Sequence, residues 1–159
     1  MTATVEARAL DPGAFAQYGT VVERPARDHD AEGPGWRWWA ETASLAETGG
    51  AYGIGFLDLR AAPLAFDWAE RHERSPEMVV ALAGACLVYV SAASPEQHEP
   101  GTFEVFRIDH GQGVIFAPGV WHGAPLAVDG PAAAMVLLRM GTGAEDTTIV
   151  RFGEVRVAG

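Results

Sequence analysis

Turn-forming residues divide this chain into short apolar segments, and this division limits the folds that it can adopt. The 159 residues include 19 glycines and 10 prolines. About ten segments between them have the composition of short strands: 20–22, 36–42, 52–60, 65–72, 78–82, 86–91, 103–108, 114–117, 132–140 and 147–152. Strands that recur every ~8–12 residues with turns between them are typical of a β-sandwich or barrel. We therefore predict an all-β fold.

Local signals refine this prediction. Ala83-Gly84-Ala85 separates two of the apolar segments and predicts a hairpin turn. Asp11 suits a helix N-cap, Pro12 the first helical position and Gly19 the end, so one short N-terminal helix is expected. The polar stretches 24–35 and 94–101 are expected to be loops that expose His29 and His98. Residues 1–159 contain no repeat and no linker-like stretch, which indicates a single domain.

The composition disfavours some classes of function. The formal net charge is −10, whereas phosphate recognition needs a basic surface, so nucleic-acid binding is not expected. No apolar run reaches the roughly 18 residues of a membrane span, and the first residues lack the basic-then-apolar order of a secretory signal. We expect a cytoplasmic protein that is not bound to membranes. Its single cysteine, Cys86, is expected to be a buried, unreactive thiol.

Polar residues interrupt the apolar pattern in two places. Glu70 and His72 are two residues apart, so in a strand they leave the same face, and Glu77 follows shortly after. In the second place, Pro118-Gly119 bends the chain just before His122. Together, Glu70, His72, Glu77 and His122 are candidate ligands of one divalent ion such as Zn, Mn, Fe or Ni. The alternative is that residues 70–74 form a solvated charge run and His72 is merely packed.

The spacing of these residues resembles the two motifs of the cupin superfamily. His72, Glu77 and Gly84 follow the first motif, with Glu70 where cupins usually have their first histidine. Gly119 and His122 follow the second motif. The resemblance implies a jelly-roll barrel in which these His and Glu positions hold a metal ion.

A closer resemblance, to the ureidoglycolate lyase family, covers nearly the whole chain. The blocks that carry it are Phe15-x-x-Tyr18-Gly19-x-Val21-Val22, Glu70-Arg71-His72, Gly111-Gln112-Gly113-Val114 and Gly119-Val120-Trp121-His122. The family has the cupin fold, is usually homodimeric, and releases urea from ureidoglycolate to give glyoxylate in purine catabolism. This chain departs from the family pattern at Glu77, where the family usually has Gln, at Gly123, where it usually has a polar residue, and at Leu138, where it usually has an acid. Glu77 makes this chain look more like a metal-binding cupin than its relatives do.

The lyase reaction assigns roles to particular residues. His72 and His122 would be the acid and base, since imidazole titrates near working pH, with Glu77 as the third catalytic residue. Arg139 or Arg37 would bind the substrate carboxylate, and Trp121 would shape the pocket at the barrel mouth. Arg71 points away from His72 and is expected to form a structural ion pair. Ordinary core positions are expected at Val79, Leu82, Leu87, Val88, Val90, Val105, Phe116, Val136 and Leu137.

Three functions therefore stay open from the sequence. The first is a carbon–nitrogen lyase of the ureidoglycolate type, acting on a small carboxylated carbinolamine. The second is a metal-dependent cupin enzyme of another class, an isomerase or oxygenase. The third is a barrel that binds a small molecule without turnover.

Overall fold

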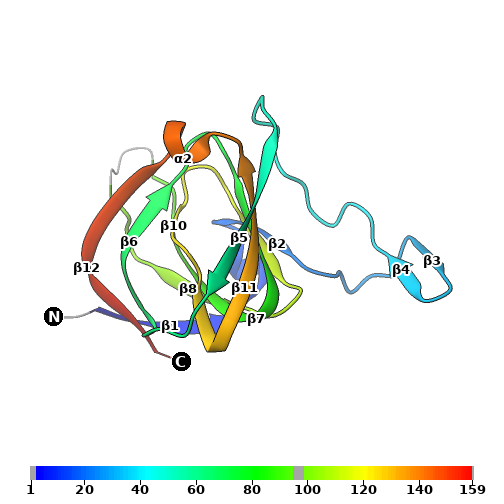
Figure 1. Ribbon diagram of the computed structural model, residues 1–159, viewed down its shortest axis with the longest axis horizontal. Coiled ribbons are helices and arrows are strands. Elements are labelled where there is room, and N and C mark those ends of the chain that lie inside the picture. Colours follow the sequence, from blue (N-terminus) through cyan, green and yellow to red (C-terminus); the bar gives the residue numbers. More distant parts are fainter. Residues whose placement is uncertain (1–2, 95–98, 159) are drawn as a thin grey trace.

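The computed structural model describes residues 3–94 and 99–158, and these residues form a β-barrel from which one arm projects (Figure 1). The expected position of His98 lies outside the described residues. The described strands are β1 (Ala3–Ala9), β2 (Gly19–Val22), β3 (Ala31–Gly33), β4 (Trp36–Trp38), β5 (Tyr52–Leu59), β6 (Ala65–Arg71), β7 (Glu77–Ser91), β8 (Glu104–Ile108), β9 (Gly113–Phe116), β10 (Trp121–His122), β11 (Leu126–Arg139) and β12 (Thr148–Ala158). The helices are α1 (Pro12–Phe15) and α2 (Thr142–Glu145). The predicted all-β fold is confirmed.

The barrel closes because β10 pairs with two strands. Hydrogen-bonded neighbours follow the order β10-β6-β12-β1-β8-β7, and β10 also pairs with β7, which completes the ring. Strand β7 also pairs with β9 near its start and with β11 on both sides of Gly84, and these two strands lead to β2 and β5. One strand, β7, thus belongs both to the ring and to a second sheet of order β5-β11-β7-β9-β2.

Two apolar clusters hold these sheets together. One lies on the ring face that carries Leu87, Tyr89 and Trp121, where Phe66 stacks on Tyr89 with ring centroids 3.9 Å apart. The other lies on the opposite face of β7 and includes Phe106, Phe116 and, from the N-terminal segment, Phe15. Burial of such side chains supplies about 1.5–3 kcal/mol each, so both clusters contribute to the stability of the barrel.

The predicted N-terminal helix is confirmed, but it is shorter than the helix from Pro12 to Gly19 that the sequence predicts. The Asp11 side chain accepts a hydrogen bond from the Ala14 N–H, and Pro12 opens the helix as expected. Helix α1 ends at Phe15, and Gly19 begins β2 instead of ending the helix. A second short helix, α2, was not predicted, because its N-cap Gly141 makes no side-chain capping bond that the sequence could reveal. None of the described helices is long and apolar enough to cross a membrane.

The predicted hairpin at Gly84 is wrong. Residues 77–91 form one continuous strand, which changes direction at Gly84, where φ is +68°. Before this point Val79 and Ala81 face one core cluster; beyond it Val88 and Val90 face the same cluster. The residues of β7 that face this cluster thus change from odd-numbered to even-numbered positions. Such a change indicates a β-bulge, in which one extra residue bends the strand. Leu82, expected in the core, is 40% exposed just before the bend.

The loop predicted for residues 24–35 contains part of a small hairpin. Strands β3 and β4 pair antiparallel, with Gly33 opposite Trp36, and β4 ends at Trp38 where a strand to residue 42 was expected. His29 is half-buried, not exposed as expected, because its ring packs edge-on against Trp39 with centroids 5.9 Å apart.

The bend in β7 predicts a specific sensitivity to substitution. A Cβ at Gly84 would lie 2.7 Å from the Pro131 carbonyl oxygen, in addition to the strain of a positive φ. Gly84→Ala should lower the free energy of unfolding by about 2–4 kcal/mol, measured by urea denaturation. Gly111→Ala is the matched control, since Gly111 has φ +85° but open space around its Cβ position; strain alone predicts a loss of about 1 kcal/mol. Equal losses in the two variants would contradict crowding at the bend.

Candidate functional site

Four predicted residues come together where β6, β7 and β10 meet. Glu70 on β6 lies directly across from His122 on β10, and His72 follows the end of β6. Glu77 begins β7. One ligand atom from each of the four lies within 4.8 Å of those of the others. The structure thus brings the four predicted residues together. The side chains of Glu70 and His72 lie on the same side, as expected for residues two apart in a strand.

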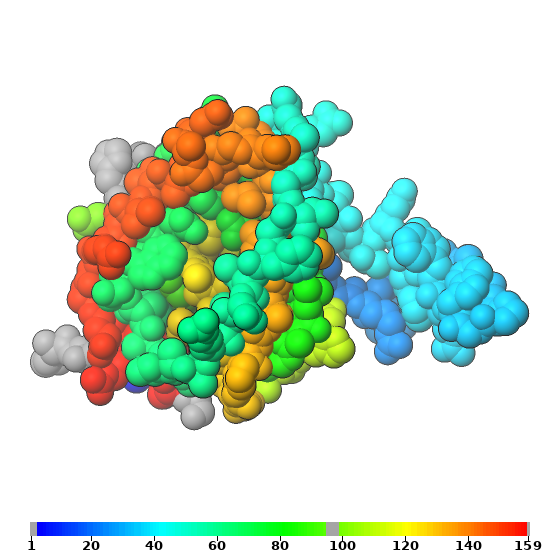
Figure 2. All heavy atoms as spheres, in the orientation of Figure 1, coloured from blue at the N-terminus to red at the C-terminus, as the bar shows by residue number. Residues whose placement is uncertain are grey.

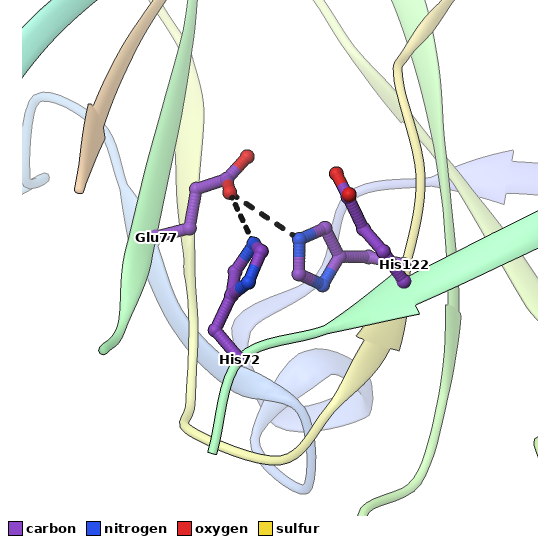
Figure 3. Close-up of side chains that lie close together, drawn as sticks. His72, Glu77 and His122 are labelled. Carbon is purple, nitrogen blue, oxygen red and sulfur yellow. Dashed lines mark hydrogen bonds and ion pairs between the residues drawn. The ribbon is translucent and has the colours of Figure 1, made fainter. Parts of the chain in front are cut away.

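The two imidazoles converge on a single carboxylate oxygen. Nε2 of His72 lies 3.0 Å from Glu77 Oε2, and Nε2 of His122 lies 3.4 Å from the same atom (Figure 3). The side chains of His72 and His122 are only 3% and 2% exposed, and that of Glu77 is 12% exposed. The three groups therefore interact where water screens them little.

The outer nitrogen of each imidazole fixes its tautomer. Nδ1 of His72 lies 3.0 Å from the Asp146 carbonyl oxygen, and Nδ1 of His122 lies 3.0 Å from the Val120 carbonyl oxygen. A carbonyl oxygen only accepts hydrogen bonds, so both Nδ1 atoms carry the proton. In the neutral imidazole, Nε2 then presents a lone pair to Glu77. Three facing lone pairs repel one another, so a proton or a cation has to lie among them.

The charges within the cluster favour an ionised Glu77 and a protonated His72. Burial opposes the charge of Glu77, but His122 and His72 outweigh it and lower its pKa to about 2. Burial also opposes protonation of His72, yet the hydrogen bond and the charge of Glu77 prevail and raise its pKa above 6.5. In the metal-free cluster these interactions favour a charged Glu77 carboxylate beside a protonated His72.

Aromatic packing holds the ring of His122. It stacks on Phe116 with centroids 4.4 Å apart and planes inclined by 19°, and its other neighbour is His72, edge-on at 5.1 Å. Phe116, on β9, is the cross-strand partner of Glu77 on β7. A ring packed in this way is held in one orientation, which a metal ligand or a general base requires.

A single carboxylate shapes the turn that joins His72 to Glu77. Asp146 accepts hydrogen bonds from the backbone N–H groups of Glu73, Arg74 and Ser75 at 3.0–3.1 Å. Burial opposes the charge of Asp146, but these bonds outweigh it and lower its pKa. Since the same residue's carbonyl oxygen accepts from His72, Asp146 positions both the turn and the imidazole.

Sequence reasoning missed this support. Asp146 and Thr147, whose hydroxyl lies 3.1 Å from His72 Nδ1, are more than seventy residues from His72 in the chain. Ser75 was missed as well; its hydroxyl accepts from the Arg139 N–H and donates to the Pro76 carbonyl oxygen. Contacts to backbone atoms leave no spacing pattern that a sequence could show.

The structure does not bring the residues predicted to contact substrate to the ion pair. Arg37 lies on the projecting arm, with Nε 3.8 Å from Glu32. Arg139 ends β11, its side chain 16% exposed and paired with Glu145 at 3.1 Å. Trp121 is fully buried in the apolar cluster that includes Leu87 and Tyr89, and it does not line the barrel mouth. The reason is that its side chain points to the opposite face of β10 from that of His122. The roles of these residues in substrate binding stay predictions.

The expected structural role of Arg71 is confirmed. Its guanidinium pairs with Glu73 at 2.9 Å and lies 4.7 Å from the centre of the Trp121 ring. It is buried on the face opposite His72, as alternation along β6 required.

The closed ring and its buried His/Glu cluster define a cupin-type jelly-roll barrel. Among solved structures, the dTDP sugar isomerase of Desulfovibrio desulfuricans G20 superposes with a TM-score of 0.51 at 15% identity, covering 84% of this chain and 82% of that one. A similarity at this level of identity supports the fold alone.

The sequence comparisons identify the family. The profile of the ureidoglycolate lyase family matches residues 2–157. The ureidoglycolate lyase of Pseudomonas putida strain F1 is 28% identical over 139 residues, which cover 84% of this chain and 83% of that protein. That of Stutzerimonas stutzeri strain A1501 is 28% identical over 147 residues, covering 89% and 85%. This chain belongs to the ureidoglycolate lyase family, as its Glu-Arg-His and Gly-Val-Trp-His blocks indicated.

The role of Asp146 predicts a loss of both stability and ligand geometry on substitution. Asp146→Ala removes the acceptor of three backbone N–H groups and should lower the free energy of unfolding by about 2–3 kcal/mol. It should also weaken binding of Zn²⁺ about 10–100-fold, because the turn connects two candidate ligands. Calorimetry and urea denaturation measure these effects. Glu145→Ala, at an exposed neighbouring side chain, is the control; an equal loss there would contradict the positioning role.

The ion pair also predicts a pH dependence for the metal-free protein. Because the pKa of His72 is raised on folding, the stability it provides is present below pH 6.5 and is lost as the pH rises through the folded-state pKa. Because the pKa of Glu77 is lowered, the stability it provides is present above pH 4.5 and is lost toward pH 2. His122 and Glu70 face the same pair. The stability difference between the wild type and Glu77→Gln, measured in EDTA, should therefore be largest between pH 4.5 and 6.5 and should fall as the pH rises through the folded-state pKa of His72. A constant difference would contradict the pair. With saturating Zn²⁺ the alkaline decrease should reverse, since metal binds deprotonated imidazole.

Proposed function

We propose that this chain is a ureidoglycolate lyase, which eliminates urea from ureidoglycolate to give glyoxylate. Family membership over residues 2–157 supports the reaction. The observation that carries the proposal is the convergence of two imidazole Nε2 atoms on Glu77 Oε2, with both Nδ1 atoms held by backbone carbonyl groups. Such a buried pair of imidazoles can accept and donate protons at fixed positions.

The reaction needs two proton transfers and no redox partner. A base removes the proton of the hydroxyl group on the central carbon, and the C–O bond becomes a carbonyl. The C–N bond breaks, its electron pair passes to the urea nitrogen, and an acid protonates that nitrogen. Atoms and charge balance between ureidoglycolate and the products glyoxylate and urea. General acid–base catalysis of this kind contributes about 10²–10⁴-fold to a rate.

His72 and His122 are the residues that would move these protons. Because each Nδ1 is bound to the backbone, each Nε2 is the nitrogen that exchanges a proton. Glu77 lies between them and stabilises whichever imidazole is charged, which favours the state with one proton shared by the site. Phe116 and the surrounding apolar residues keep bulk water from the pair.

The same quartet fits a divalent metal ion. Its donors are two imidazole nitrogens and two carboxylates, Glu70, His72, Glu77 and His122, a set that suits Zn, Mn, Fe or Ni. The fit follows from the tautomers, since both Nε2 lone pairs face the carboxylate. A bound ion would supply Lewis-acid polarisation of the substrate hydroxyl and lower its pKa.

Arg139 is the proposed partner of the substrate carboxylate. Its backbone N–H is held by Ser75 in the turn between His72 and Glu77, so it borders the site. Its present partner Glu145 is 60% exposed, and such surface pairs contribute only about 0–1 kcal/mol. A substrate carboxylate could therefore replace Glu145. Arg37 and Trp121 are not placed beside the cluster and remain secondary candidates.

One observation favours a second function. Glu77 brings a carboxylate to the two imidazoles and completes a set of metal ligands, which suits a metal-dependent cupin enzyme of another class, an isomerase or oxygenase. A barrel that binds a small molecule without turnover is the remaining alternative. The homodimeric state, the cytoplasmic location and the role in purine catabolism stay predictions.

Metal content and urea release together test the proposal. We expect about one metal per chain in the wild type, lost on chelation and in Glu77→Gln, and urea release that falls by about 10²-fold or more in His72→Ala and His122→Ala. Glu154→Gln, at an exposed acid on β12, is the control and should retain both.

Each other outcome points to a different function. Urea release without metal would leave His72 and His122 as the acid and base alone. Metal without urea release would contradict the lyase and favour another metal-dependent reaction. Absence of both would leave the binding barrel.

A further inference from the structure

The two strands beside β7 leave Glu77 unequally accessible. On β9, its cross-strand partner Phe116 is 1% exposed and stacks on His122. On β11, its cross-strand partner Leu138 is only half-buried. Phe116 thus fills the space on the β9 side, so a substrate that approaches Glu77 along the inner face of this sheet has to come over β11.

The strand beyond β11 is β5, whose side chains alternate between two faces. Ile54 and Phe56 point outward and are 65% and 73% exposed. Leu57 points inward and packs against the core cluster on the inner side of the sheet. By this alternation Gly53 and Gly55 also lie on the inner face. The stretch of β5 nearest the His/Glu cluster therefore presents backbone, without side chains, to the inside of the barrel.

Cross-strand pairing puts these two glycines in line with the cluster. Gly53 pairs with Leu138, which in turn pairs with Glu77, so the three residues form one row across the sheet. The next row, one step farther along both strands, contains Gly55 and Val136. Figure 1 shows β11 ending and β5 beginning at the end of the barrel that carries α2, and Figure 2 shows the two strands side by side. A molecule that enters at this end meets the first row and then the second.

The structure leaves room over both glycines. A Cβ at Gly55 would have no described atom of another segment nearer than the Val136 carbonyl oxygen, at 4.0 Å. A Cβ at Gly53 would lie 3.4 Å from Cγ of Met140, whose flexible side chain is 64% exposed. Gly53, Gly55, Val136 and Leu138 are all half-buried, in contrast to the filled β9 side. A small group can therefore extend from the cluster over β11 and onto β5.

We propose that Gly53, Gly55, Val136 and Leu138 bind the leaving group of the substrate, and we call these four residues the glycine face. The space over the two glycines admits a small substituent on that leaving group. The chain should therefore act on ureidoglycolate and also on derivatives that carry an alkyl group on the distal nitrogen of the urea. This inference rests on the proposed lyase reaction and deepens it, because it names the class of substrate.

The spacing of the strands supports this assignment. Neighbouring strands are about 4.8 Å apart, close to the length of a ureido group, so a substrate whose reacting carbon lies at the His/Glu cluster extends its ureido group over β11. A substituent on the far nitrogen then reaches β5, where Gly53 and Gly55 lie. The four residues of the glycine face are uncharged, and a planar, uncharged group can rest on them without the large cost of desolvating a charge.

The chemical step is the same with and without the substituent. The hydroxyl proton leaves, the C–O bond becomes a carbonyl, and the C–N bond breaks with its electron pair passing to the nitrogen, which takes up a proton. Ureidoglycolate then gives glyoxylate and urea, and methylureidoglycolate gives glyoxylate and methylurea. Glyoxylate release therefore measures both reactions in the same way.

A comparison of these two substrates tests the glycine face. The wild type should turn over both, with kcat/KM values within about 10-fold of each other. Gly55→Val fills the space beside Val136 and should lower kcat/KM for methylureidoglycolate about 10–200-fold more than for ureidoglycolate, the effect of a methyl group that no longer fits. Gly55→Ala should give an intermediate ratio. Both substrates need the same catalytic residues, so the ratio of their kcat/KM values reports the leaving group alone.

Gly153→Val is the matched control. Gly153 lies in β12, has no described atom of another segment within 4 Å of its Cβ position and, like Gly55, has no positive φ. This variant should leave the ratio unchanged, and urea denaturation with near-UV circular dichroism checks that both valine variants are folded. A wild type that rejects methylureidoglycolate, or a ratio unaffected by Gly55→Val, would overturn the inference while the lyase stands. Release of glyoxylate from neither substrate by the wild type would overturn the lyase, and this inference with it.

Discussion

The continuous hydrogen bonding of β7 determines the rest of this structure. Its first half pairs with β9 and the second part of β11, and its second half pairs with β8, β10 and the start of β11. One strand can serve both sheets only if it bends between them, and Gly84 permits that bend with its positive φ. The two ends of β7 then supply the site: Glu77 begins the strand, and Val90 near its end lies across from His122. The geometry of the cluster is therefore a consequence of the barrel's closure.

The cluster is chemically incomplete without a positive charge. Backbone carbonyl groups bind the Nδ1 atoms of both imidazoles, which directs both Nε2 atoms to one carboxylate oxygen. A proton satisfies this arrangement in the metal-free protein, and the donor set could also hold a divalent ion. The same contacts therefore fit both proposed roles, acid–base pair and metal site, and Asp146 would support either because it fixes the turn between His72 and Glu77.

The sequence predicted what depends on local periodicity and failed where tertiary contacts decide. The quartet could be found because Glu70 and His72 obey the strand alternation and because His122 follows a bend marked by Pro118-Gly119. Gly84 was interpreted as a hairpin, since a glycine between two apolar runs has the same sequence signal at a turn and at a bulge. Leu82 looked like a core residue because hydrophobicity alone cannot distinguish the inner face of a sheet from its outer face. Asp146 had no signal, since its partners are backbone N–H groups.

If the site binds a carboxylate substrate, as we propose, the pairing of the nearby arginines indicates which of them is available to it. Each of the three arginines beside it already has an acidic or carbonyl partner: Arg71 has Glu73, Arg74 has Asp146 and the Glu145 carbonyl oxygen, and Arg139 has the Glu145 carboxylate. Arg71 is buried on the opposite face, and the Asp146 that pairs with Arg74 also holds the turn, so displacing either partner would cost structure. The pair between Arg139 and Glu145 is different, because Glu145 is exposed and holds nothing else in the site through its carboxylate. A substrate carboxylate at Arg139, as proposed, would replace one anion by another at little electrostatic cost, whereas a neutral ligand would leave Glu145 in place.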